Sequence, residues 1–206
     1  MNNPEIASKK DLCHIASMHI EASINKRKRT PRSKYHFYLE KVKLFYTFDA
    51  NSIILTKNNG NITGVLIYTY DEQVFNKYAG PSHIGFYIRI LKTLSGYYGF
   101  DFLKYFKTLR SSLGKADRIQ KNSPDTEAYG KIWVLIVADE YRRQGIASKL
   151  LKTCIKNIKL TEIKYLRVTV KDDNRPAIDA YEKQNFEKIG TCEESSGHSY
   201  IMQLKL

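Results

Sequence analysis

The first part of the chain follows a helical pattern. Apolar residues recur at helical spacing over residues 8–23, and Ser8 followed by Asp11 has the pattern of a capping box. A second helix is expected to begin near Pro31, because proline suits the first turn of a helix. The positions expected to face inward on this second helix are Tyr38, Val42 and Phe45.

A β-hairpin is expected next. The runs 52–56 and 62–70 are rich in β-branched and apolar residues, and they flank a short turn that contains Asn59 and Gly60. Asparagine and glycine accept the positive φ angles that tight hairpin turns require. The two runs therefore predict a pair of antiparallel strands.

Residues 71–125 are predicted to be an insert of a different character. Within it, the stretch 84–106 is rich in aromatic residues and roughly helical, but Gly96 and Gly99 interrupt the pattern. We therefore expect two short helices there. The polar stretch 111–125 is expected to be a flexible loop.

The pattern is clearest in the last part of the chain. A buried strand at 132–137 precedes a helix, a second strand is expected at 165–170, a second helix at 175–183, and two final strands at 186–190 and 199–204. This order predicts a mixed sheet with at least one parallel pair, because a crossover helix joins parallel strands. The core face of the helix after the first strand carries Ile146, Leu150, Leu151, Cys154, Ile155 and Ile158.

Length and composition favour a single folded domain over residues 1–206. The chain is 42% hydrophobic and 12% aromatic, which is typical of a globular protein. It has no run of 18 apolar residues and no signal-like start, so we expect neither a transmembrane segment nor export, and a cytoplasmic location. Three widely spaced cysteines predict neither a disulfide framework nor a metal site. A monomer and a homodimer are both open.

The charge of the chain favours an anionic partner or substrate. Lysine and arginine together number 34 against 21 acidic residues, which leaves a net charge of +13. The run 26–34 supplies six basic residues, and the rest of the chain is still basic without it. Such a run is usually a solvated surface, but it can also recognise a polyanion.

The loop after Val137 has the features of an anion cradle. Gly145 and the small Ala147 stand where the next helix begins, so backbone N–H groups can approach an anion closely. The dipole of the helix adds favourable charge at the same place. A glycine can also merely turn the chain, and an alanine can merely pack. Taken alone, the loop leaves both interpretations open.

A second motif begins at Asn174, after the next strand. Asn174 is a natural N-cap, and Pro176 suits the first turn of a helix. Ala177 and Ala180 leave little bulk on the face toward which Tyr181 also points, so this face can lie along a thin ligand. A helix tyrosine also commonly packs in a core with its hydroxyl toward water.

The loop resembles the cofactor loop of the GCN5-related N-acetyltransferase superfamily. That loop has the pattern Gln/Arg-x-x-Gly-x-Gly/Ala, which is matched by Arg142, Gly145 and Ala147. The resemblance covers residues 130–206, and the helix–helix–hairpin order over residues 8–70 also fits the family.

The second motif resembles the same family. Its pattern is Asn-x-x-Ala-x-x-x-Tyr-x-x-x-Gly-Phe, which is matched by Asn174, Ala177, Tyr181 and Phe186. Position 185 is Asn where the family usually has Gly. Asparagine tolerates left-handed backbone angles better than most residues, so this departure is compatible with the turn.

The resemblance implies a three-layer α/β fold, in which a mixed central β-sheet is flanked by helices on both faces. It also implies acetyl-CoA as the acyl donor, a primary amine as the acceptor, and no metal. Backbone N–H groups would hold the pyrophosphate, and the strand before the loop would pair with the pantetheine arm. The residues expected to bind the donor are Leu135, Ile136, Val137, Arg142, Arg143, Gln144, Gly145, Ile146, Ala147, Asn174, Ala177 and Tyr181.

Acetyl transfer to an amine benefits from an acid that protonates the leaving thiolate and a base that deprotonates the amine. The resemblance makes Tyr181 the general acid that protonates the departing CoA thiolate, a role worth roughly 10²–10⁴ in rate. Many relatives carry a Glu on the strand before the cofactor loop, but 131–137 contains no acid here. The base candidates are Glu21, Glu127 and His198, from regions that line the acceptor side in relatives. An acceptor whose proton leaves through water would need none of them.

Three interpretations of the acceptor follow. The first is a small, anionic metabolite such as a nucleotide-linked amino sugar, with the run 26–34 and the aromatic stretch 84–106 available to recognise it. The second is an aminoacyl-tRNA or a protein amine, of which a basic protein N-terminus fits the charge least. The third is an acyl-CoA-binding module without turnover. The aromatic stretch is also compatible with an anionic membrane surface.

Overall fold

The computed structural model describes residues 3–23, 32–80, 83–95, 127–194 and 197–206. The chain divides into two compact units, each made of segments that are distant in the sequence. The first unit comprises residues 1–6, 52–72 and 117–206, and the second comprises residues 7–51 and 73–116. That the chain acts as a single domain stays a prediction.

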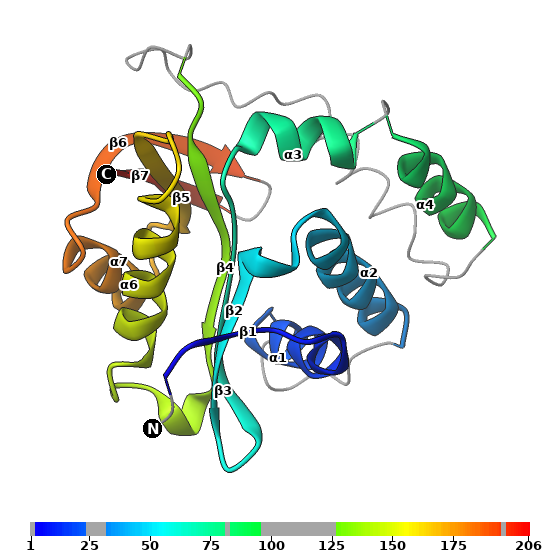
Figure 1. The fold of residues 1–206 in the computed structure, drawn as a ribbon, viewed down its shortest axis with the longest axis horizontal. Helices are drawn as coiled ribbons and strands as arrows, with labels where there is room; N and C mark the ends of the chain where they lie inside the picture. Colours follow the sequence, from blue (N-terminus) through cyan, green and yellow to red (C-terminus); the bar gives the residue numbers. More distant parts are fainter. Residues whose placement is uncertain (1–2, 24–31, 81–82, 96–126, 195–196) are drawn as a thin grey trace. The chain divides into compact units, whose positions relative to one another are not determined.

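The first unit is built on a seven-stranded mixed sheet, as far as the described residues go, with the order β1-β2-β3-β4-β5-β7-β6 (Figure 1). Only β4 and β5 run parallel, and every other neighbouring pair is antiparallel. This mixed sheet confirms the predicted α/β class and its parallel pair. Its strands are β1 (Glu5–Ile6), β2 (Ile53–Asn58), β3 (Asn61–Thr69), β4 (Gly130–Val137), β5 (Tyr165–Lys171), β6 (Glu187–Glu194) and β7 (Gly197–Lys205).

Local chemistry accounts for the hairpin of β2 and β3. The turn between them contains Asn59 at φ 50° and Gly60 at φ 81°, the left-handed angles that a two-residue hairpin turn needs. The side chains of β3 from Ile62 to Thr69 are buried. The predicted hairpin is confirmed.

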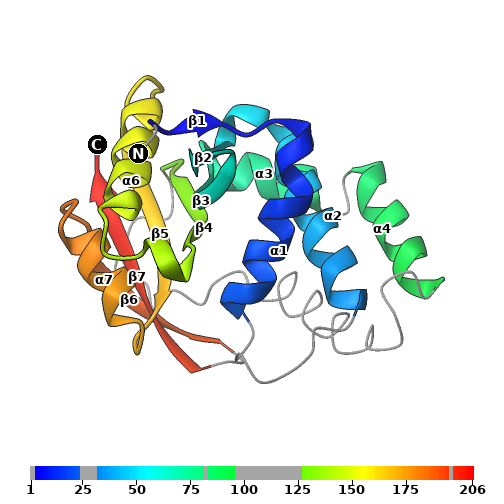
Figure 2. The same ribbon diagram turned by 90° about the horizontal axis from the view of Figure 1, so that it is seen from below.

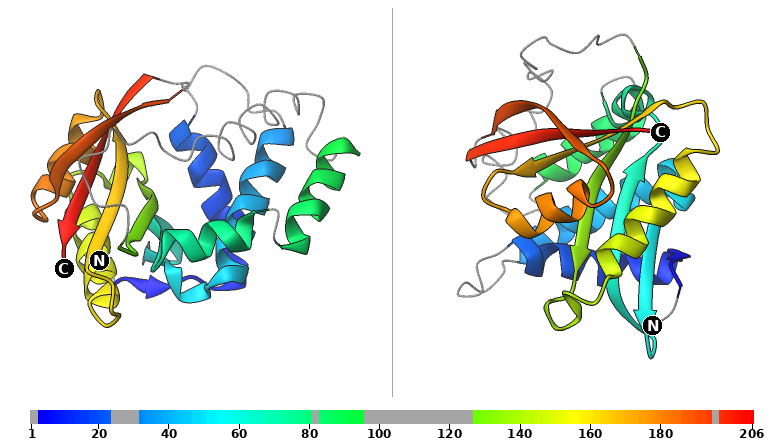
Figure 3. Two further views of the ribbon diagram at one scale, coloured as in Figure 1. Left: turned by 90° about the horizontal axis from the view of Figure 1, so that it is seen from above. Right: turned by 90° about the vertical axis from the view of Figure 1, so that its left-hand side faces the viewer.

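Among the residues that the structure describes, two α-helices pack on the sheet of the first unit. Helix α6 (Ile146–Ile158) packs against β2, β3 and β4, and Figure 3 shows it lying across one face of the sheet. Helix α7 (Arg175–Glu182) follows β5 and contributes Ile178 and Tyr181 to the same core. The predicted core face of α6 is confirmed, with Ile155 partly buried at its margin.

Helix α6 lies close against the sheet where it begins. A Cβ atom on Gly64 of β3 would lie 2.7 Å from Cγ2 of Ile146 and 3.1 Å from Cδ1 of Leu150. Any larger side chain at position 64 therefore pushes the start of the helix away from the sheet. This contact fixes the place of the loop that enters α6.

The second unit is helical, as Figure 2 shows for α1 and α2, which pack side by side. Ser8 forms the predicted capping box, since its N–H donates to Oδ2 of Asp11 at 2.8 Å. The ring of Phe45 on α2 stacks on Phe75 of α3 at 4.6 Å. Its helices are α1 (Leu12–Ser23), preceded by a 3₁₀ turn (Lys9–Asp11), α2 (Arg32–Phe48), α3 (Glu72–Ala79), whose first residue belongs to the first unit, and α4 (Ile84–Leu94).

The insert matches its prediction in part. Helix α4 corresponds to the first of the two short helices expected in 84–106, whereas the pattern did not indicate α3. The second short helix, the loop 111–125 and most of the basic run 26–34 lie outside the described residues. In the part of the chain that the structure describes, no helix is both long and apolar enough to cross a membrane.

Candidate functional site

Strands β4 and β5 part midway along β4. Their pairing ends at Ile132 and Val168. Beyond that point β4 continues to pair with β3, but within the described residues its other edge, at 134–137, has no strand beside it. An open strand edge presents backbone N–H and C=O groups that an extended ligand can pair with. Leu135, Ile136 and Val137, the residues predicted to contact the pantetheine arm, lie on this open edge.

A bulge in β4 accounts for the parting. The register of β4 against β3 shifts at Trp133, which the pairing skips. An extra residue in one strand bends it and increases its twist. The indole Nε1 of Trp133 donates to Oγ1 of Thr69 at 3.0 Å, so the bulge is anchored to β3.

The loop after β4 turns through two residues with left-handed backbone. Arg143 has φ 60°, and Gly145, the N-cap of α6, has φ 77°. No atom lies within 4 Å of the position that a Cβ of Gly145 would take. The backbone angle, and not crowding, is therefore what favours glycine at this position.

Backbone donors gather at this loop. Within the described part of the chain, the N–H groups from Arg143 to Ser148 donate no hydrogen bond, and the first helical bond runs from Lys149 N–H to the carbonyl of Gly145 at 3.0 Å. Such donors and the positive end of the helix dipole suit phosphate oxygens. The predicted cradle therefore has the donor set that a diphosphate requires.

Two predicted side chains brace the loop. The guanidinium of Arg142 pairs with Asp139 at 2.6 Å and donates to the carbonyl of Val137 at 3.3 Å. The amide of Gln144 donates to the carbonyl of Glu140 at 3.1 Å. Gln144 still offers its backbone N–H to the cradle, whereas the backbone N–H of Arg142 is taken by Asp139. Donor binding by Arg142 stays a prediction.

The second motif is ordered by its own cap. Oδ1 of Asn174 accepts a hydrogen bond from the N–H of Ala177 at 3.3 Å, which leaves its amide nitrogen as a donor for a ligand. Ala177 is partly buried against the core. Asn185 has φ 63°, which confirms that the turn before Phe186 is left-handed. Asparagine fills a position that the family usually gives to glycine.

Tyr181 lies inside the core of the first unit. It is 4% exposed, its ring centroid lies 5.4 Å from that of Phe186, and it shares a cluster with Ile132 and Val168, the residues at which β4 and β5 part. Its hydroxyl makes no hydrogen bond within the described residues. Burial raises the pKa of this hydroxyl, so Tyr181 keeps its proton at neutral pH, as a general acid must.

The three predicted bases are exposed. Glu127 forms an ion pair with Lys164 at 2.9 Å, and Glu21 lies on the surface of α1 in the second unit. His198 was expected in the loop before the last strand, but it lies within β7, where Nδ1 is 3.9 Å from a carboxylate oxygen of Glu193. The hairpin pairing of β6 and β7 extends further than the sequence pattern predicts. The role of these three residues as base stays a prediction.

The structure shows a buried polar cluster that the sequence did not reveal. Glu72 is 5% exposed, and its carboxylate accepts a hydrogen bond from the Tyr129 hydroxyl and pairs with the ammonium of Lys131. The guanidinium carbon of Arg167 lies 4.0 Å from the centroid of the Tyr129 ring, and its Nε donates to Gln203 at 2.7 Å. We call Glu72, Tyr129, Lys131 and Arg167 the Glu72 cluster.

The Glu72 cluster lies on the face of the sheet opposite α6. Ile132 and Val168 belong to the core beneath α6, and successive side chains of a strand point to opposite faces. Lys131 and Arg167 are their neighbours in sequence and are paired with each other in the register. The sequence carried one weak signal of this site, the acidic pair Asp71 and Glu72 directly after the predicted strand 62–70.

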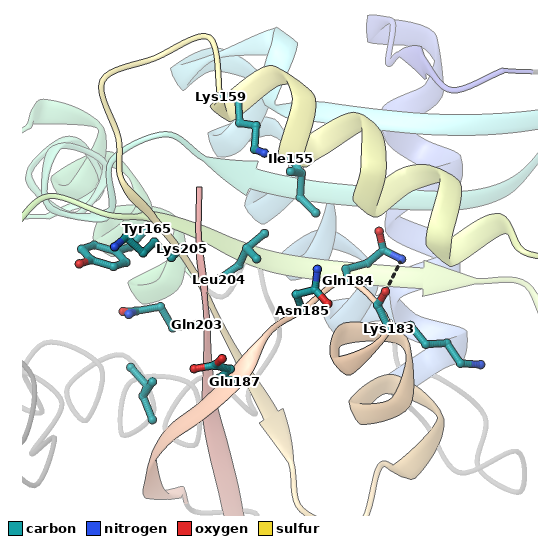
Figure 4. A pocket seen from close by; sticks show the side chains of 11 residues that line it. Ile155, Lys159, Tyr165, Lys183, Gln184, Asn185, Glu187, Gln203, Leu204 and Lys205 are labelled. Atoms are coloured by element: carbon teal, nitrogen blue, oxygen red, sulfur yellow. Dashed lines mark hydrogen bonds between the residues drawn. The ribbon is translucent and has the colours of Figure 1, made fainter.

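A polar hollow of about 600 Å³ lies elsewhere in the first unit (Figure 4). Residues at and just after the C-terminal end of α6, just after α7, and from strands β5, β6 and β7 line it, among them Lys159, Gln184 and Lys205. The amide of Gln184 donates to the carbonyl of Lys183 at 3.2 Å. This hollow lies at the end of α6 remote from the cradle, so we do not assign the acyl donor to it.

Comparison with known proteins identifies the family. The model of the Acetyltransferase (GNAT) family matches residues 19–186, and the chain belongs to this family of acyltransferase enzymes. An N-alpha-acetyltransferase of Saccharolobus solfataricus is 42% identical over 72 residues, which cover 34% of this chain and 42% of that protein. The chain thus spans less than half the length of this curated relative.

Solved structures share the fold at low identity. PH1933 from Pyrococcus horikoshii OT3 superposes with a TM-score of 0.62 and 17% identity, over 99% of this chain and 98% of that one. A structure of the NatC complex bound to Gag peptide and CoA has a TM-score of 0.59 and 13% identity, over 98% and 97%. The fold that the two sequence motifs implied is thereby confirmed.

Proposed function

We propose that this protein transfers the acetyl group of acetyl-CoA to a primary amine. The observation that carries the proposal is the run of backbone N–H donors from Arg143 to Ser148 beside the open edge of β4. A diphosphate suits the donors, and an extended amide chain suits the strand edge. CoA contains both groups, a diphosphate joined to an extended pantetheine arm with two amides. The loop that suits the diphosphate directly follows the strand edge that suits the arm.

Tyr181 is the proposed general acid. Bound acetyl-CoA supplies a thioester, whose carbonyl carbon the amine nitrogen attacks as the C–S bond breaks. The hydroxyl of Tyr181 gives its proton to the departing sulfur. A tyrosine hydroxyl is protonated at neutral pH and burial raises its pKa further, so the proton is present until the sulfur takes it up. The amine must lose its own proton before it attacks.

The first candidate acceptor is a small anionic metabolite with a primary amine, such as a nucleotide-linked amino sugar. The net charge of +13 supports this choice. An anionic substrate is attracted to a basic protein over distances of about a Debye length. Such a substrate needs only a few basic side chains for recognition.

The α-amino group of a polypeptide is the second candidate. The stretch of 42% identity to an N-alpha-acetyltransferase supports it. A polypeptide with acidic residues near its N-terminus would satisfy this similarity and the basic charge together. An aminoacyl-tRNA offers the same α-amine next to phosphates, and it is distinguished by its sensitivity to ribonuclease.

The test measures CoA release from acetyl-CoA with two fractions of a cell extract, one of metabolites and one of macromolecules. Activity in the metabolite fraction supports the first acceptor, and activity in the other fraction that protease or ribonuclease destroys supports a polypeptide or a tRNA. Tyr181→Phe should lower kcat by roughly 10²–10⁴ and leave acetyl-CoA affinity unchanged. Tyr165→Phe, at a tyrosine remote from the cradle, serves as the control. Binding of acetyl-CoA without release of CoA in either fraction would show a binding module and refute the proposed activity.

A further inference from the structure

The proposed reaction lacks a base on the strand where relatives carry one, and the structure supplies an acid from elsewhere. We propose that Glu72 is the base that takes the proton from the acceptor amine, an inference that rests on the proposed function. Among the described residues, Glu72 is the acidic side chain that is buried, whereas Glu21 and Glu127 lie at the surface.

Three contacts fix the carboxylate of Glu72. Its backbone N–H donates to the carbonyl of Tyr129 at 3.1 Å, and its side chain accepts from the Tyr129 hydroxyl and pairs with Lys131. Glu72 is also the first residue of α3, where the helix dipole favours a negative charge. A carboxylate held in this way is positioned in advance for proton transfer.

The place of Glu72 relative to the donor follows from the sheet. The pyrophosphate cradle comes after Val137, so a pantetheine arm along the open edge runs back toward Trp133 and ends where β4 and β5 part. Lys131, the partner of Glu72, stands one residue before Ile132, the last residue of β4 that pairs with β5.

The proposed acid and the proposed base reach this point from opposite faces of the sheet. Tyr181 lies in the core on the α6 face, together with Ile132 and Val168. The Glu72 cluster lies on the other face.

The protons balance along this route. An Oε atom of Glu72 takes a proton from the ammonium form of the acceptor, and the neutral nitrogen then attacks the thioester carbon. As the C–S bond breaks, the sulfur receives the proton of Tyr181, and the second proton that the nitrogen loses on becoming an amide restores Tyr181. The proton on Glu72 leaves to solvent, so the products are the acetyl amide, CoA and one proton.

The charged and titratable groups that contact Glu72 are Tyr129, just before β4, and Lys131 of β4, and the guanidinium of Arg167 on β5 packs on the ring of Tyr129. Burial, and then the hydrogen bond to Glu72, raise the pKa of Tyr129, so its hydroxyl stays a donor to the carboxylate across the neutral range.

The experiment compares kcat/KM of the wild type and Glu72→Gln across pH, with acetyl-CoA and the acceptor purified from the active extract fraction. The variant keeps the shape of the side chain but cannot take a proton. We expect it to be about 10²-fold slower near neutral pH. The deficit should shrink as the pH approaches the pKa of the acceptor amine, because more of the amine is then already neutral.

Glu162→Gln is the matched control, since it removes an exposed carboxylate that has no proposed role in the reaction, and it should follow the wild type at every pH. Acetyl-CoA affinity and Tm of all three proteins are measured alongside. If kcat/KM of Glu72→Gln were lower by the same factor at every pH, Glu72 would have a structural role only, and the assignment would be overturned. A wild type that releases no CoA would overturn the proposed function and this inference with it, so the two failures are distinguishable.

Tyr129→Phe keeps the test decisive if Glu72→Gln does not fold. Removing a donor to the charged carboxylate raises the pKa of a carboxyl group. The rise of kcat/KM with pH should therefore move to higher pH in Tyr129→Phe. If kcat/KM of Tyr129→Phe were lower but rose with pH over the same range as in the wild type, a role of Glu72 in proton transfer would be contradicted.

Discussion

Substituting Gly64 tests whether the closeness of α6 to the sheet positions the cradle. In Gly64→Ala the new methyl would stand 2.7 Å from Cγ2 of Ile146 and 3.3 Å from the carbonyl oxygen of Ile136. Ordinary contact begins at 3.4 Å, so the start of α6 must move by about 0.7 Å. The branched side chain of Ile146 is itself buried and has little room to turn away.

The expected cost follows from overpacking. Extra methyl groups in a packed core typically cost about 1–3 kcal/mol. For a chain of this size, about 2 kcal/mol lowers Tm by roughly 4–8 °C. The displaced residues begin α6 and carry part of the cradle. Acetyl-CoA should therefore also bind more weakly, with a larger Kd by calorimetry. Thermal unfolding followed by circular dichroism measures the change in Tm.

Gly190→Ala is the control for this substitution. No atom lies within 4 Å of a Cβ at position 190, and its φ is not in the left-handed range, so its Tm should stay within about 1 °C of the wild type. If Gly64→Ala unfolded at the same temperature as Gly190→Ala and bound acetyl-CoA equally well, the reasoning about close packing would be refuted.

Three further predictions concern single residues. Gly145→Ala should cost about 1 kcal/mol of stability through its φ of 77° alone and raise the Kd for acetyl-CoA, and an unchanged Kd would show that the turn is not needed for the cradle. Asn185→Ala should cost a similar free energy of unfolding and lower Tm accordingly, whereas Asn185→Gly should not. Equal Tm values for the two variants would contradict the left-handed turn. Burial lowers the pKa of His19 to about 4, below its ordinary value, so the neutral form contributes stability that is full above about pH 6.5 and is lost as the pH falls through 4. His19→Gln should therefore lose less Tm than the wild type between pH 7 and pH 4, and an identical loss would show that His19 does not titrate with unfolding.

Features set by neighbouring residues could be predicted from the sequence. The hairpin turn at Asn59 and Gly60, the core face of α6 and the left-handed turn at Asn185 each depend on a few residues close together in the chain. The two motifs could therefore be placed correctly, together with the family they resemble. Tyr181 could be singled out for the same reason, because it belongs to the motif that begins at the N-cap residue of its own helix.

Features set by long-range pairing could not be predicted. The parting of β4 from β5 depends on a bulge at Trp133, which shows only in the register against β3. The contact of Glu72 with Lys131 joins residues 59 positions apart, and nothing in either local pattern links them. His198 was expected in a loop because the pairing of β6 with β7 extends further than their composition predicts. Pairing across the sheet decided each of these positions.

Hydrogen–deuterium exchange with and without acetyl-CoA tests the central claim most directly. The account predicts that acetyl-CoA slows exchange of the amides from Arg143 to Ser148 and of those along the open edge at 134–137, and leaves the β6–β7 hairpin unchanged. Binding of acetyl-CoA with unchanged exchange at both places would show that the donor is held elsewhere and would contradict the account.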